Sequence, residues 1–486
     1  MLLINKAGYT SSMNRRTKIV ATLGPATDDP VAMERLIRAG CDVVRINFSH
    51  GDPETHARRI RLVRAIAREL DTDVAVMADL SGPKIRIDRF REGHVELQAG
   101  QTFTLVAEEP APPGDQHQVG VAYLGLVNDV QPGSELLLDD GLMAMRVQQV
   151  EGTRIICEVL TSGRLSDRKG LNLRGGGLSL PGISEADELD IRRAAEWQVD
   201  YVAVSFPRAA EDIERARELL RAAGGEAWLV AKIERTEAIE NLDAILEASD
   251  AVLVARGDLG VEIGEAELPG LQKRIISASL EHNRPVITAT QMMQSMVESP
   301  IPTRAEVLDV ANAVIDGTDA VMLSAETAVG RHPSRVVEAM ARICEGAERH
   351  VQAHIPQRRL TVRTERTDQA IAMAAMITAN NVSVEAIVAL TESGSTARWM
   401  SRVRSSVPII ALSPNRASLR RMRLFQHVFP LFFASEQYRT AEVARAAIER
   451  VVEAGLVERG KRVILTMGDE MGVEGGTNVM KIVSTG

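Results

Sequence analysis

The sequence predicts an α/β protein whose largest part is a closed, parallel (β/α)8 barrel. Three observations lead to this prediction. Short apolar runs alternate with longer amphipathic stretches eight times, a series of short β-like runs interrupts the alternation after the third unit, and a further α/β segment follows the eighth. Eight consecutive βα units favour a closed barrel of the TIM type over an open, doubly wound sheet. The length of 486 residues agrees with about three domains.

The expected domain boundaries follow from where the patterns change. They are an N-terminal leader at 1–16, the barrel at 17–83 and 179–350, an inserted small β domain at 84–178, a polar linker at 351–364 and a C-terminal α/β domain at 365–486.

Apolar runs predict the strands of the barrel, and helical periodicity predicts its helices. The expected strands are 18–24, 43–49, 74–80, 201–206, 227–234, 251–256, 285–290 and 320–326. The expected helices are 29–39, 53–70, 184–198, 209–223, 236–248, 268–283, 303–316 and 333–349.

The insert and the C-terminal segment have different patterns. The insert contains short runs such as "HVELQAGQTFTLV", "ELLLDDG" and "RIICEVL", separated by Pro and Gly turns and without a long amphipathic helix. The C-terminal segment alternates again, with helices in "DQAIAMAAMITANN", "TESGSTARWMSR" and 439–455, and strands in "AIVAL", "PIIALS", "HVFPLFF" and "RVILTMG". We therefore expect an all-β insert and a separate α/β domain.

Composition excludes several classes of protein. The net charge is −9, which argues against nucleic acid or an anionic membrane as the main partner. No apolar run approaches the ~18 residues of a spanning helix, and the N-terminus lacks the apolar core of a signal peptide. Cys41, Cys157 and Cys344 are isolated from one another, so a disulfide framework is not expected. We expect a cytoplasmic protein with no nucleic-acid or membrane partner.

Polar residues follow six of the predicted barrel strands. They are Arg45, Asn47, Ser49 and His50; Asp79, Lys84 and Arg86; Lys232 and Glu234; Arg256, Gly257 and Asp258; Thr288, Thr290 and Gln291; and Ser324 and Glu326. The carboxyl ends of barrel strands meet at one rim, where barrel enzymes place their active sites. Any one of these groups alone is typical of a solvated strand end or a turn, but the joint pattern predicts a functional rim.

The residue types at this rim indicate a particular chemistry. Glu234 and Asp258, on adjacent strands, suit an oxygen-ligated Mg²⁺ ion that keeps several waters. Lys232, Arg45 and Arg86 add the positive charge that a transferring phosphoryl group requires. Free backbone N–H groups in "RGDLG" would bind a carboxylate or phosphate. No Walker motif or protein-kinase motif set is present. The residues by themselves therefore predict Mg²⁺-dependent phosphoryl or carboxylate chemistry without identifying the substrate.

Eight stretches together closely resemble the pyruvate kinase family. They are "TKIVATLGPAT", "VVRINFSHG", "ADLSGPKIR", "VAKIER", "ARGDLGVEIG", "ITATQMMQSM", "PTRAEVLDVANAV" and "DAVMLSAETAVG", and they occur in the family's order. The resemblance covers residues 15–486. It implies a barrel with a mobile β-barrel lid inserted after the third strand and a C-terminal regulatory domain. It also implies transfer of phosphate from phosphoenolpyruvate to ADP, giving pyruvate and ATP in the last step of glycolysis.

The resemblance implies a role for each matching residue. Glu234 and Asp258 are the expected ligands of Mg²⁺ (or Mn²⁺), and Lys232 the cation that stabilises the phosphoryl group and the enolate. Arg45 and Arg86 are expected to contact phosphate. The residues expected to bind substrate are Arg45, Lys232, Gly257, Asp258 and Thr290. Thr290, Ser324 and Glu326 are expected to form a water relay that protonates the enolate. The residues expected to bind the nucleotide are Thr22, Asn47, His50, Arg86 and Lys169, the last of which lies on the lid.

The stretch "ADLSGPKIR" departs from the pattern of many family members. In those members a Thr carbonyl helps to hold a required K⁺ ion, and a Glu stands where this chain has Lys84. The corresponding ligands here would be Asn47, Ser49, Asp79 and the Leu80 carbonyl. Because an ammonium supplies a fixed positive charge, Lys84 is expected to replace K⁺ and to make the activity independent of it. The alternative is an exposed turn lysine.

The C-terminal domain contains a possible effector site. The resemblance assigns phosphorylated effectors, a sugar phosphate or a nucleotide, to the loop "TESGSTA", with Thr391, Ser393, Gly394, Ser395 and Thr396, although these residues are also ordinary helix caps. The nearby arginines could bind anions, but a solvated helix face is the default interpretation: Arg398, Arg402, Arg404, Arg416, Arg420, Arg421 and Arg423. A homotetramer is usual in the family.

Two other functions stay open at this point. A barrel lyase or aldolase could act on phosphoenolpyruvate or pyruvate through the same Mg²⁺ and enolate chemistry, but would lack a lid lysine such as Lys169. A catalytically silent sensor of phosphorylated metabolites is a second alternative, against which the intact Lys232, Glu234 and Asp258 argue. ADP-dependent formation of pyruvate would distinguish all three.

Overall fold

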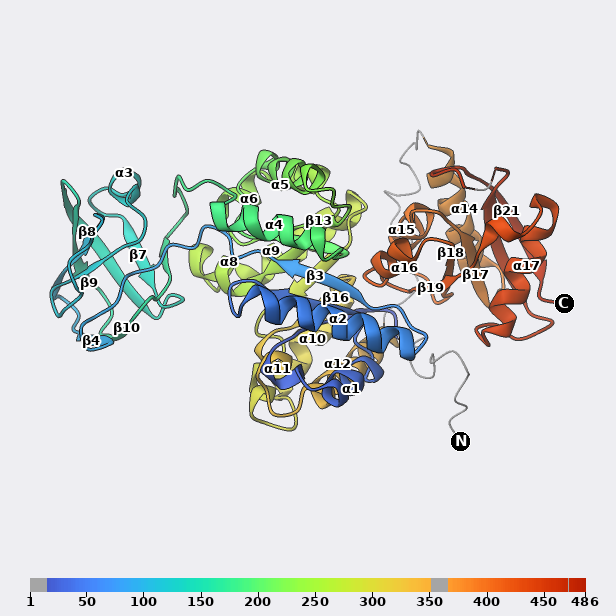
Figure 1. The fold of residues 1–486 in the computed structure, drawn as a ribbon, viewed down its shortest axis with the longest axis horizontal. Coiled ribbons are helices and arrows are strands. Elements are labelled where there is room, and N and C mark those ends of the chain that lie inside the picture. The colour runs from blue at the N-terminus through green and yellow to red at the C-terminus, as the bar shows by residue number, and fades with distance from the viewer. Residues whose placement is uncertain (1–14, 351–365, 471) are drawn as a thin grey trace.

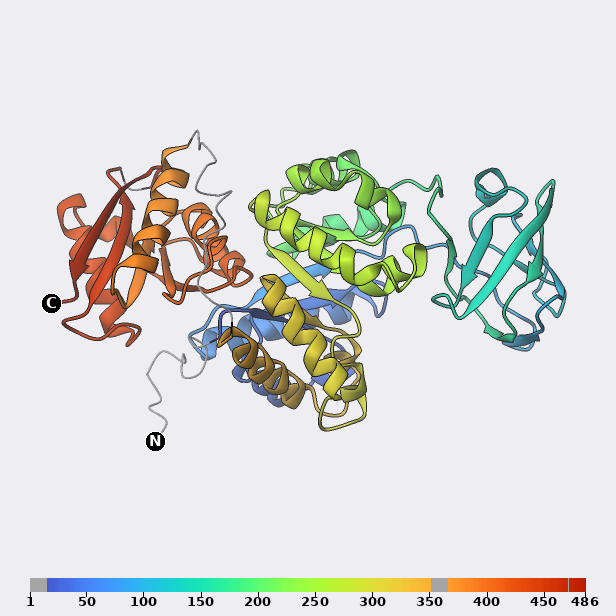
Figure 2. The ribbon, with the colours of Figure 1, turned by 180° about the vertical axis from the view of Figure 1, so that it is seen from behind.

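The computed structural model describes residues 15–350 and 366–486 except residue 471, and the expected linker at 351–364 lies outside them. Figure 1 shows the inserted β domain, the barrel and the C-terminal domain in a row, with the barrel in the middle. In Figure 2, seen from behind, the helices of the later βα units, in yellow, cover the other side of the barrel. Within the described residues, no helix combines the length and the apolar character needed to cross a membrane.

The barrel is closed and consists of eight parallel strands. Their order is β1-β16-β15-β14-β13-β12-β3-β2. The bounds are β1 (Lys18–Thr22), β2 (Val43–Asn47), β3 (Ala75–Asp79), β12 (Tyr201–Val204), β13 (Trp228–Ile233), β14 (Ala251–Ala255), β15 (Val286–Ala289) and β16 (Ala320–Leu323). Each of the eight expected strands is present, shortened by up to three residues in total at its ends. The strands are mainly apolar because both of their faces are buried, and most of their polar residues lie near the C-terminal ends.

Helices cover the outside of the barrel and begin at recognisable caps. They are α1 (Pro30–Arg38), α2 (Pro53–Glu69), α4 (Glu185–Glu196), α5 (Ala210–Ala222), α6 (Thr236–Glu240), α7 (Leu242–Ala248), α8 (Arg256–Ile263), α9 (Leu268–Glu281), α10 (Arg304–Asp316), α11 (Ala325–Ala328) and α12 (Pro333–Glu348). Asp29 and Asp52 cap α1 and α2 ahead of a proline at the first helical position, and Ser184 and Thr303 form capping boxes. The single helix expected at 236–248 is instead two helices that meet at Asn241.

The apolar core of the barrel has two layers, which follow from the alternation of side chains along each strand. One layer packs between strands and helices and includes Ile19, Val44 and Val76. The other fills the inside of the barrel and includes Val20 and Met77. The inner layer ends below the C-terminal rim, where polar side chains take over the inward-facing positions.

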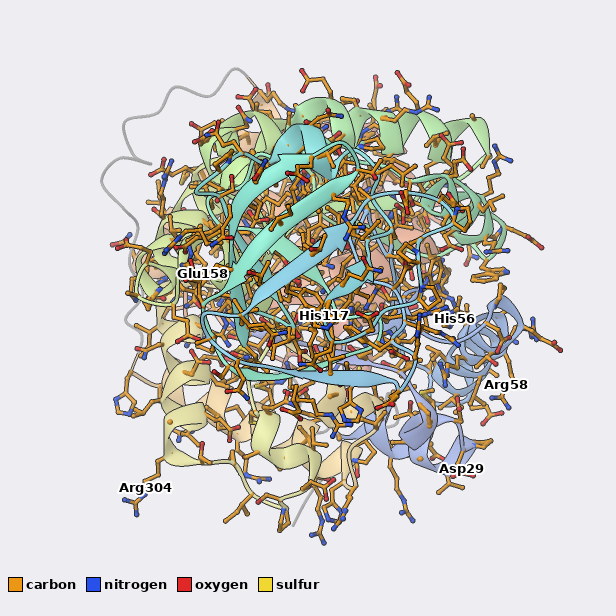
Figure 3. The ribbon with its side chains drawn as sticks, turned by 90° about the vertical axis from the view of Figure 1, so that its left-hand side faces the viewer. Asp29, His56, Arg58, His117, Glu158 and Arg304 are labelled. Atoms are coloured by element: carbon orange, nitrogen blue, oxygen red, sulfur yellow. The ribbon has the colours of Figure 1, made fainter. Side chains whose placement is uncertain are left out.

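The inserted domain is built from β-strands and one short helix, α3 (Leu126–Asp129). A six-stranded sheet has the order β11-β7-β8-β9-β5-β6, and β10 pairs with β4 in a separate two-stranded sheet. The strands are β4 (His94–Leu97), β5 (Thr102–Val106), β6 (Gln118–Gly120), β7 (Glu135–Leu138), β8 (Met143–Glu151), β9 (Arg154–Val159), β10 (Gly163–Ser166) and β11 (Leu171–Leu173). In Figure 3 this domain, with His117 and Glu158, stands in front of the barrel, which carries Asp29 and Arg304 at its edge.

The C-terminal domain is a five-stranded sheet of order β19-β18-β17-β20-β21. Its strands are β17 (Ala386–Leu390), β18 (Ile409–Ser413), β19 (Val428–Phe432), β20 (Arg462–Gly468) and β21 (Thr477–Ser484), and its helices are α14 (Thr367–Asn381), α15 (Ser395–Ser401), α16 (Arg416–Met422) and α17 (Thr440–Glu453). The antiparallel edge strand β21 was not expected, because its residues lack a strong apolar run.

Arginines of the C-terminal domain, one of them fully buried, join it to the N-terminal ends of the barrel strands. Arg402 is buried and forms a two-pronged ion pair with Asp319, which directly precedes β16. Arg420 donates to Asp200, which precedes β12, at 2.7 Å. The interpretation of this arginine-rich stretch as a solvated helix face is therefore wrong for these residues. They join the two domains, because acidic residues that directly precede barrel strands face them across the interface.

The expected leader ends inside the folded barrel. Arg15, which the sequence analysis placed in the leader, is buried and pairs with Asp42 at 2.9 Å. The backbone N–H groups of Arg16 and Thr17 donate to the carboxylate of Glu348 on α12. All three cysteines are buried and unbridged. Burial raises the pKa of each thiol to about 12, so none is a reactive nucleophile.

Candidate active site

Part of the predicted rim lines a cleft of about 730 Å³ at the C-terminal end of the barrel, and the charged cluster of Arg45, Asp79, Lys232 and Glu234 is not among the residues that line it. The cleft is bounded by residues of α8 and of the strand ends, including Gly257, Asp258, Thr290 and Ser324. The inserted domain supplies a further wall, in which Asp140 takes part. Residues from three distant parts of the chain therefore meet in one hollow.

Asp79 stands at the centre of a charged cluster. Its Oδ2 accepts a hydrogen bond from Arg45 Nε at 2.5 Å, and its Oδ1 lies 3.2 Å from Lys232 Nζ. Arg45 also donates to the Thr22 hydroxyl at 3.1 Å. Burial opposes ionisation of Asp79, but Arg45 and Lys232 hold its pKa below the ordinary value. One buried carboxylate therefore fixes two cations beside the cleft.

Lys232 is held in its charged form. Burial opposes its charge, but Asp79 and Glu234 raise its pKa above the ordinary value. Its Nζ lies 2.9 Å from Glu234 Oε1 and donates to the Ser205 hydroxyl at 2.7 Å. The alternation of strand side chains explains why Lys232 and Arg45 both extend from the inner face of the barrel.

Glu234 and Asp258, the expected metal ligands, have donor atoms that fit a divalent cation. Glu234 is buried, and its Oε1 has no hydrogen-bond partner of good geometry despite the nearby Lys232. Its Oε2 accepts from the backbone N–H of Phe206 at 2.7 Å. Burial raises the pKa of Glu234 to about 7, which a cation would reverse. Asp258 is partly exposed in the cleft. Among the described residues, no group of three or more His, Cys, Asp or Glu side chains is placed to hold a metal ion by itself, so substrate oxygens and waters would complete the coordination.

The first turn of α8 carries the backbone N–H groups that are expected to bind an anion. "RGDLG" is helical rather than a simple turn, so the backbone N–H groups of Gly257 and Asp258 lie at a helix N-terminus. The Gly257 N–H donates to the Thr290 hydroxyl at 2.8 Å, which joins two of the predicted carboxylate-binding groups. Thr290 has a φ of +68°, and Arg256 donates to its carbonyl at 2.6 Å. The buried guanidinium of Arg256 thus stabilises the left-handed backbone conformation of Thr290.

Ser324 and Glu326 differ from each other in accessibility. Ser324 lines the cleft together with Thr290. Glu326 is buried, and its two carboxylate oxygens accept from the backbone N–H groups of Ser324 and Met293, at 2.7 and 3.2 Å. Its carboxylate therefore braces the loop that carries Ser324, and Ser324 is the member of this pair that faces the cleft.

The expected nucleotide-binding residues are divided between two domains. Asn47 and His50 are on the barrel loop after β2, with their side chains 3.5 Å apart. Arg86 donates to the carbonyl of Arg168 at 2.9 Å, and Lys169 pairs with Asp139 at 2.7 Å, both within the inserted domain. Arg86 and Lys169 therefore both have partners within the inserted domain.

Lys84 does not contact the four residues proposed to hold a monovalent cation. Its ammonium is 3.2 Å from Asp258 Oδ1 and 3.9 Å from Asp140. The expected cation oxygens have other partners: Asp79 holds Arg45 and Lys232, the Leu80 carbonyl accepts from Ser205, and Asn47 Oδ1 accepts from the Ser49 N–H. The side chain is 28% exposed, so Lys84 is not the fully exposed turn lysine of the alternative interpretation, and its replacement of K⁺ stays a prediction. Lys84 is a half-buried lysine beside Asp258, one of the two expected metal ligands.

The proposed effector loop borders a small, separate cleft. Thr391 accepts from the Gly394 N–H at 3.0 Å, and the Thr396 hydroxyl bonds that of Thr477 at 2.9 Å. The Ser393 hydroxyl is buried without a hydrogen-bond partner. These bonds stabilise the loop ahead of α15, whose N-cap residue Gly394 makes no side-chain cap, so both the effector-site and the capping interpretations stay predictions.

Two groups at the site were missed by the sequence analysis. Ser205 follows β12, the fourth barrel strand, and was passed over because "SFP" contains no charge. Its place directly after a buried strand was the signal that could have identified it. Asp140 was missed because it comes from a turn of the insert, and only folding brings it to the barrel.

Comparison with known proteins identifies the family. The family model for the pyruvate kinase barrel domain matches residues 14–337, and that for the pyruvate kinase α/β domain matches residues 369–483. The chain is 50% identical to pyruvate kinase II of Salmonella typhimurium over 474 residues, covering 97% of this chain and 98% of that protein. It is 48% identical to a pyruvate kinase of Haemophilus influenzae over 471 residues, covering 96% and 98%.

A solved structure agrees with these matches. The crystal structure of a pyruvate kinase from Cryptosporidium parvum superimposes with a TM-score of 0.90 at 34% identity, covering 97% of each chain. The barrel, the inserted domain and the C-terminal sheet are therefore the family's architecture, and the chain belongs to the pyruvate kinase family of enzymes.

Proposed function

We propose that this enzyme transfers the phosphoryl group of phosphoenolpyruvate to ADP in a Mg²⁺-dependent reaction, forming pyruvate and ATP. The observation that carries the proposal is the cluster in which Asp79 holds Arg45 and Lys232 beside the buried Glu234. This cluster lies in a chain of the pyruvate kinase family. It combines fixed cations with an incompletely bonded carboxylate at the rim where barrel enzymes react.

The charges of the cluster match the charges of the reaction. A transferring phosphoryl group carries negative charge on three oxygens, and preorganised cations stabilise that charge. Lys232 is assigned to the phosphoryl group and the developing enolate, and Arg45 to phosphate. The N–H groups of Gly257 and Asp258, with the Thr290 hydroxyl, are assigned to the substrate carboxylate.

Glu234 and Asp258 would hold the divalent ion, Mg²⁺ or Mn²⁺. The buried Oε1 of Glu234 supports this assignment, because it lacks a hydrogen-bond partner of its own. A bound divalent ion supplies neutralisation of phosphate charge when present. In its absence, Lys84 and Lys232 balance the charges of the two carboxylates.

The inserted domain is assigned the role of a lid. Movement of Lys169 and Arg86 toward the barrel would bring positive charge to the nucleotide, and the closed lid would exclude water from the intermediate. Protonation of the enolate is assigned to a water relay. Ser324 and Thr290, both on the cleft wall, are its hydroxyl members, and Glu326 positions Ser324.

The decisive experiment is ADP-dependent formation of pyruvate from phosphoenolpyruvate by the purified protein with Mg²⁺. The Lys232→Met variant is expected to keep Mn²⁺ and substrate binding but to lose about 10²-fold or more in kcat, since it loses one preorganised charge. Lys273→Met is the matched control, because Lys273 is an exposed lysine on α9. Near-normal kcat in Lys232→Met would contradict the assigned role.

The activity is further proposed to be independent of K⁺. The partners of Asp79 and Leu80 support this, since they already occupy oxygens that a monovalent ion would require. Lys84 supplies a permanent positive charge near Asp258. Assays in tetramethylammonium salts should give the same kcat with and without K⁺, and Lys84→Glu should acquire K⁺ activation. Strong K⁺ activation of the unmodified enzyme would refute the proposal.

Regulation and assembly complete the proposal. A sugar phosphate or nucleotide effector is assigned to the loop at 391–397, and a Ser395→Glu variant that responds normally to every such compound would exclude it.

A homotetramer is supported by the exposed apolar side chains Ile301, Leu308 and Ile315 on and beside α10, which favour a subunit interface. Sedimentation equilibrium tests the assembly.

A further inference from the structure

We propose that Ser205 is a positioning residue for Lys232, and that its hydroxyl connects this lysine to the point where the chain leaves the barrel for the lid. The inference rests on the proposed function, because it assigns Ser205 a part in the same phosphoryl transfer. Ser205 carries no charge and does not belong to the α8 backbone groups that are assigned to the substrate carboxylate.

The hydroxyl of Ser205 is part of a short buried chain of hydrogen bonds. Lys232 Nζ donates to Ser205 Oγ at 2.7 Å, and Ser205 Oγ donates to the Leu80 carbonyl at 2.7 Å. Ser205 is 1% exposed, so its hydroxyl is shielded from bulk solvent. The hydroxyl can do both at once because it carries one donor and two acceptor lone pairs.

A neutral acceptor at this position has a specific physical advantage. The lysine ammonium is a point charge on a flexible stem, so its direction must be set by its surroundings. Asp79 and Glu234 attract it, at 3.2 and 2.9 Å, but each also cancels part of the charge that the phosphoryl group needs. The Ser205 oxygen is the shortest of the three contacts and fixes the ammonium without adding negative charge.

Ser205 and Phe206 also pack against Gly82, at the point where the chain leaves the barrel for the lid. A Cβ at Gly82 would lie 2.6 Å from the Ser205 Cβ and 2.8 Å from the Phe206 ring, so the chain at Gly82 packs directly on these two residues. The Phe206 N–H donates to Glu234 Oε2 at 2.7 Å. The end of β12 therefore contacts the hinge on one side, and the lysine and the metal ligand on the other.

The inference predicts a selective kinetic defect. Ser205→Ala removes one hydrogen bond to a buried charged group and should lower kcat about 10- to 100-fold. The KM for phosphoenolpyruvate should change less than about threefold, because Arg45 and the α8 amides are intact. Exchange of pyruvate methyl protons with deuterium, which also depends on enolate stabilisation by Lys232, should slow by a similar factor.

Two further variants separate positioning from folding. Ser205→Cys fills nearly the same volume but offers only a weak acceptor, so it should lose activity like Ser205→Ala. Ser205→Thr keeps the hydroxyl and should recover most of kcat. Ser279→Ala is the control, because Ser279 is an equally buried serine that bonds only the Ile275 carbonyl of its own helix.

The outcomes distinguish this inference from the function on which it rests. Wild-type enzyme that forms no pyruvate from phosphoenolpyruvate and ADP overturns both. Active wild-type enzyme with unchanged kcat in Ser205→Ala and Ser205→Cys overturns the positioning role alone. Equal losses in Ser205→Thr and Ser205→Ala also overturn it, since the hydroxyl would then not be the group that matters.

Discussion

Loss of the buried ion pair between Arg402 and Asp319 is expected to weaken the junction of the C-terminal domain with the barrel. The two side chains are 0% and 1% exposed, and Arg402 Nη1 is 2.7 Å from Asp319 Oδ2. The Arg402→Met variant leaves Asp319 with only the backbone N–H groups of Val286 and Gln426, at 3.0 and 2.9 Å. An uncompensated buried carboxylate of this kind costs about 3–5 kcal/mol.

The assay is urea unfolding followed by tryptophan fluorescence. Trp228 reports on this junction, because its ring stacks on that of Phe425 with centroids 5.8 Å apart. Arg331→Met is the matched control: its ion pair with Glu298 is also 2.7 Å long but is 69% and 67% exposed, so its loss should cost under about 0.5 kcal/mol. A loss below about 1 kcal/mol in Arg402→Met, or one equal to that in the control, would refute the reasoning.

Two more predictions concern other buried contacts. Burial lowers the pKa of Lys18 from 10.5 to about 7 in the folded protein, so between these values the unfolded state binds more protons and the free energy of unfolding rises with pH. Lys18→Met should reduce this slope by up to about 1.4 kcal/mol per pH unit in urea titrations, and an unchanged slope would contradict the assignment. Glu237 accepts from the Gly177 N–H at 2.6 Å where the chain returns from the lid. Glu237→Ala should speed amide hydrogen exchange at Gly177 about five- to tenfold, whereas Glu240→Ala on the same helix should not. Equal exchange rates in both variants would contradict this role of Glu237.

The barrel could be predicted from the sequence because its signals are local. Each strand is a short apolar run, each helix has its own periodicity and cap, and eight repetitions leave few alternative topologies. Lys232, Glu234 and Asp258 were predicted as site residues by the same logic, since the end of a strand can be located without knowing its neighbours. A break such as that between α6 and α7 was missed because it changes the pattern very little.

Contacts between distant segments could not be predicted in this way. The arginines from 398 to 423 have the spacing of a solvated helix face, and nothing local indicates that Arg402 and Arg420 meet acids at the starts of barrel strands. Lys84 was expected to take the place of a monovalent cation, and nothing local indicated that its ammonium would contact Asp258. Ser205 carries no charge and so gave no signal, although it makes the shortest contact to Lys232.

The sequence by itself determined which residue types stand at the rim, and with them the family and the class of chemistry. The tertiary structure decided how those residues share their partners: which oxygens of Asp79 hold Arg45 and Lys232, which lysine faces which carboxylate, and where the lid hinge touches the site. The physical reason is that periodicity and capping act over a few neighbouring residues, whereas hydrogen bonds and ion pairs act over a few ångströms between segments that only the fold brings together.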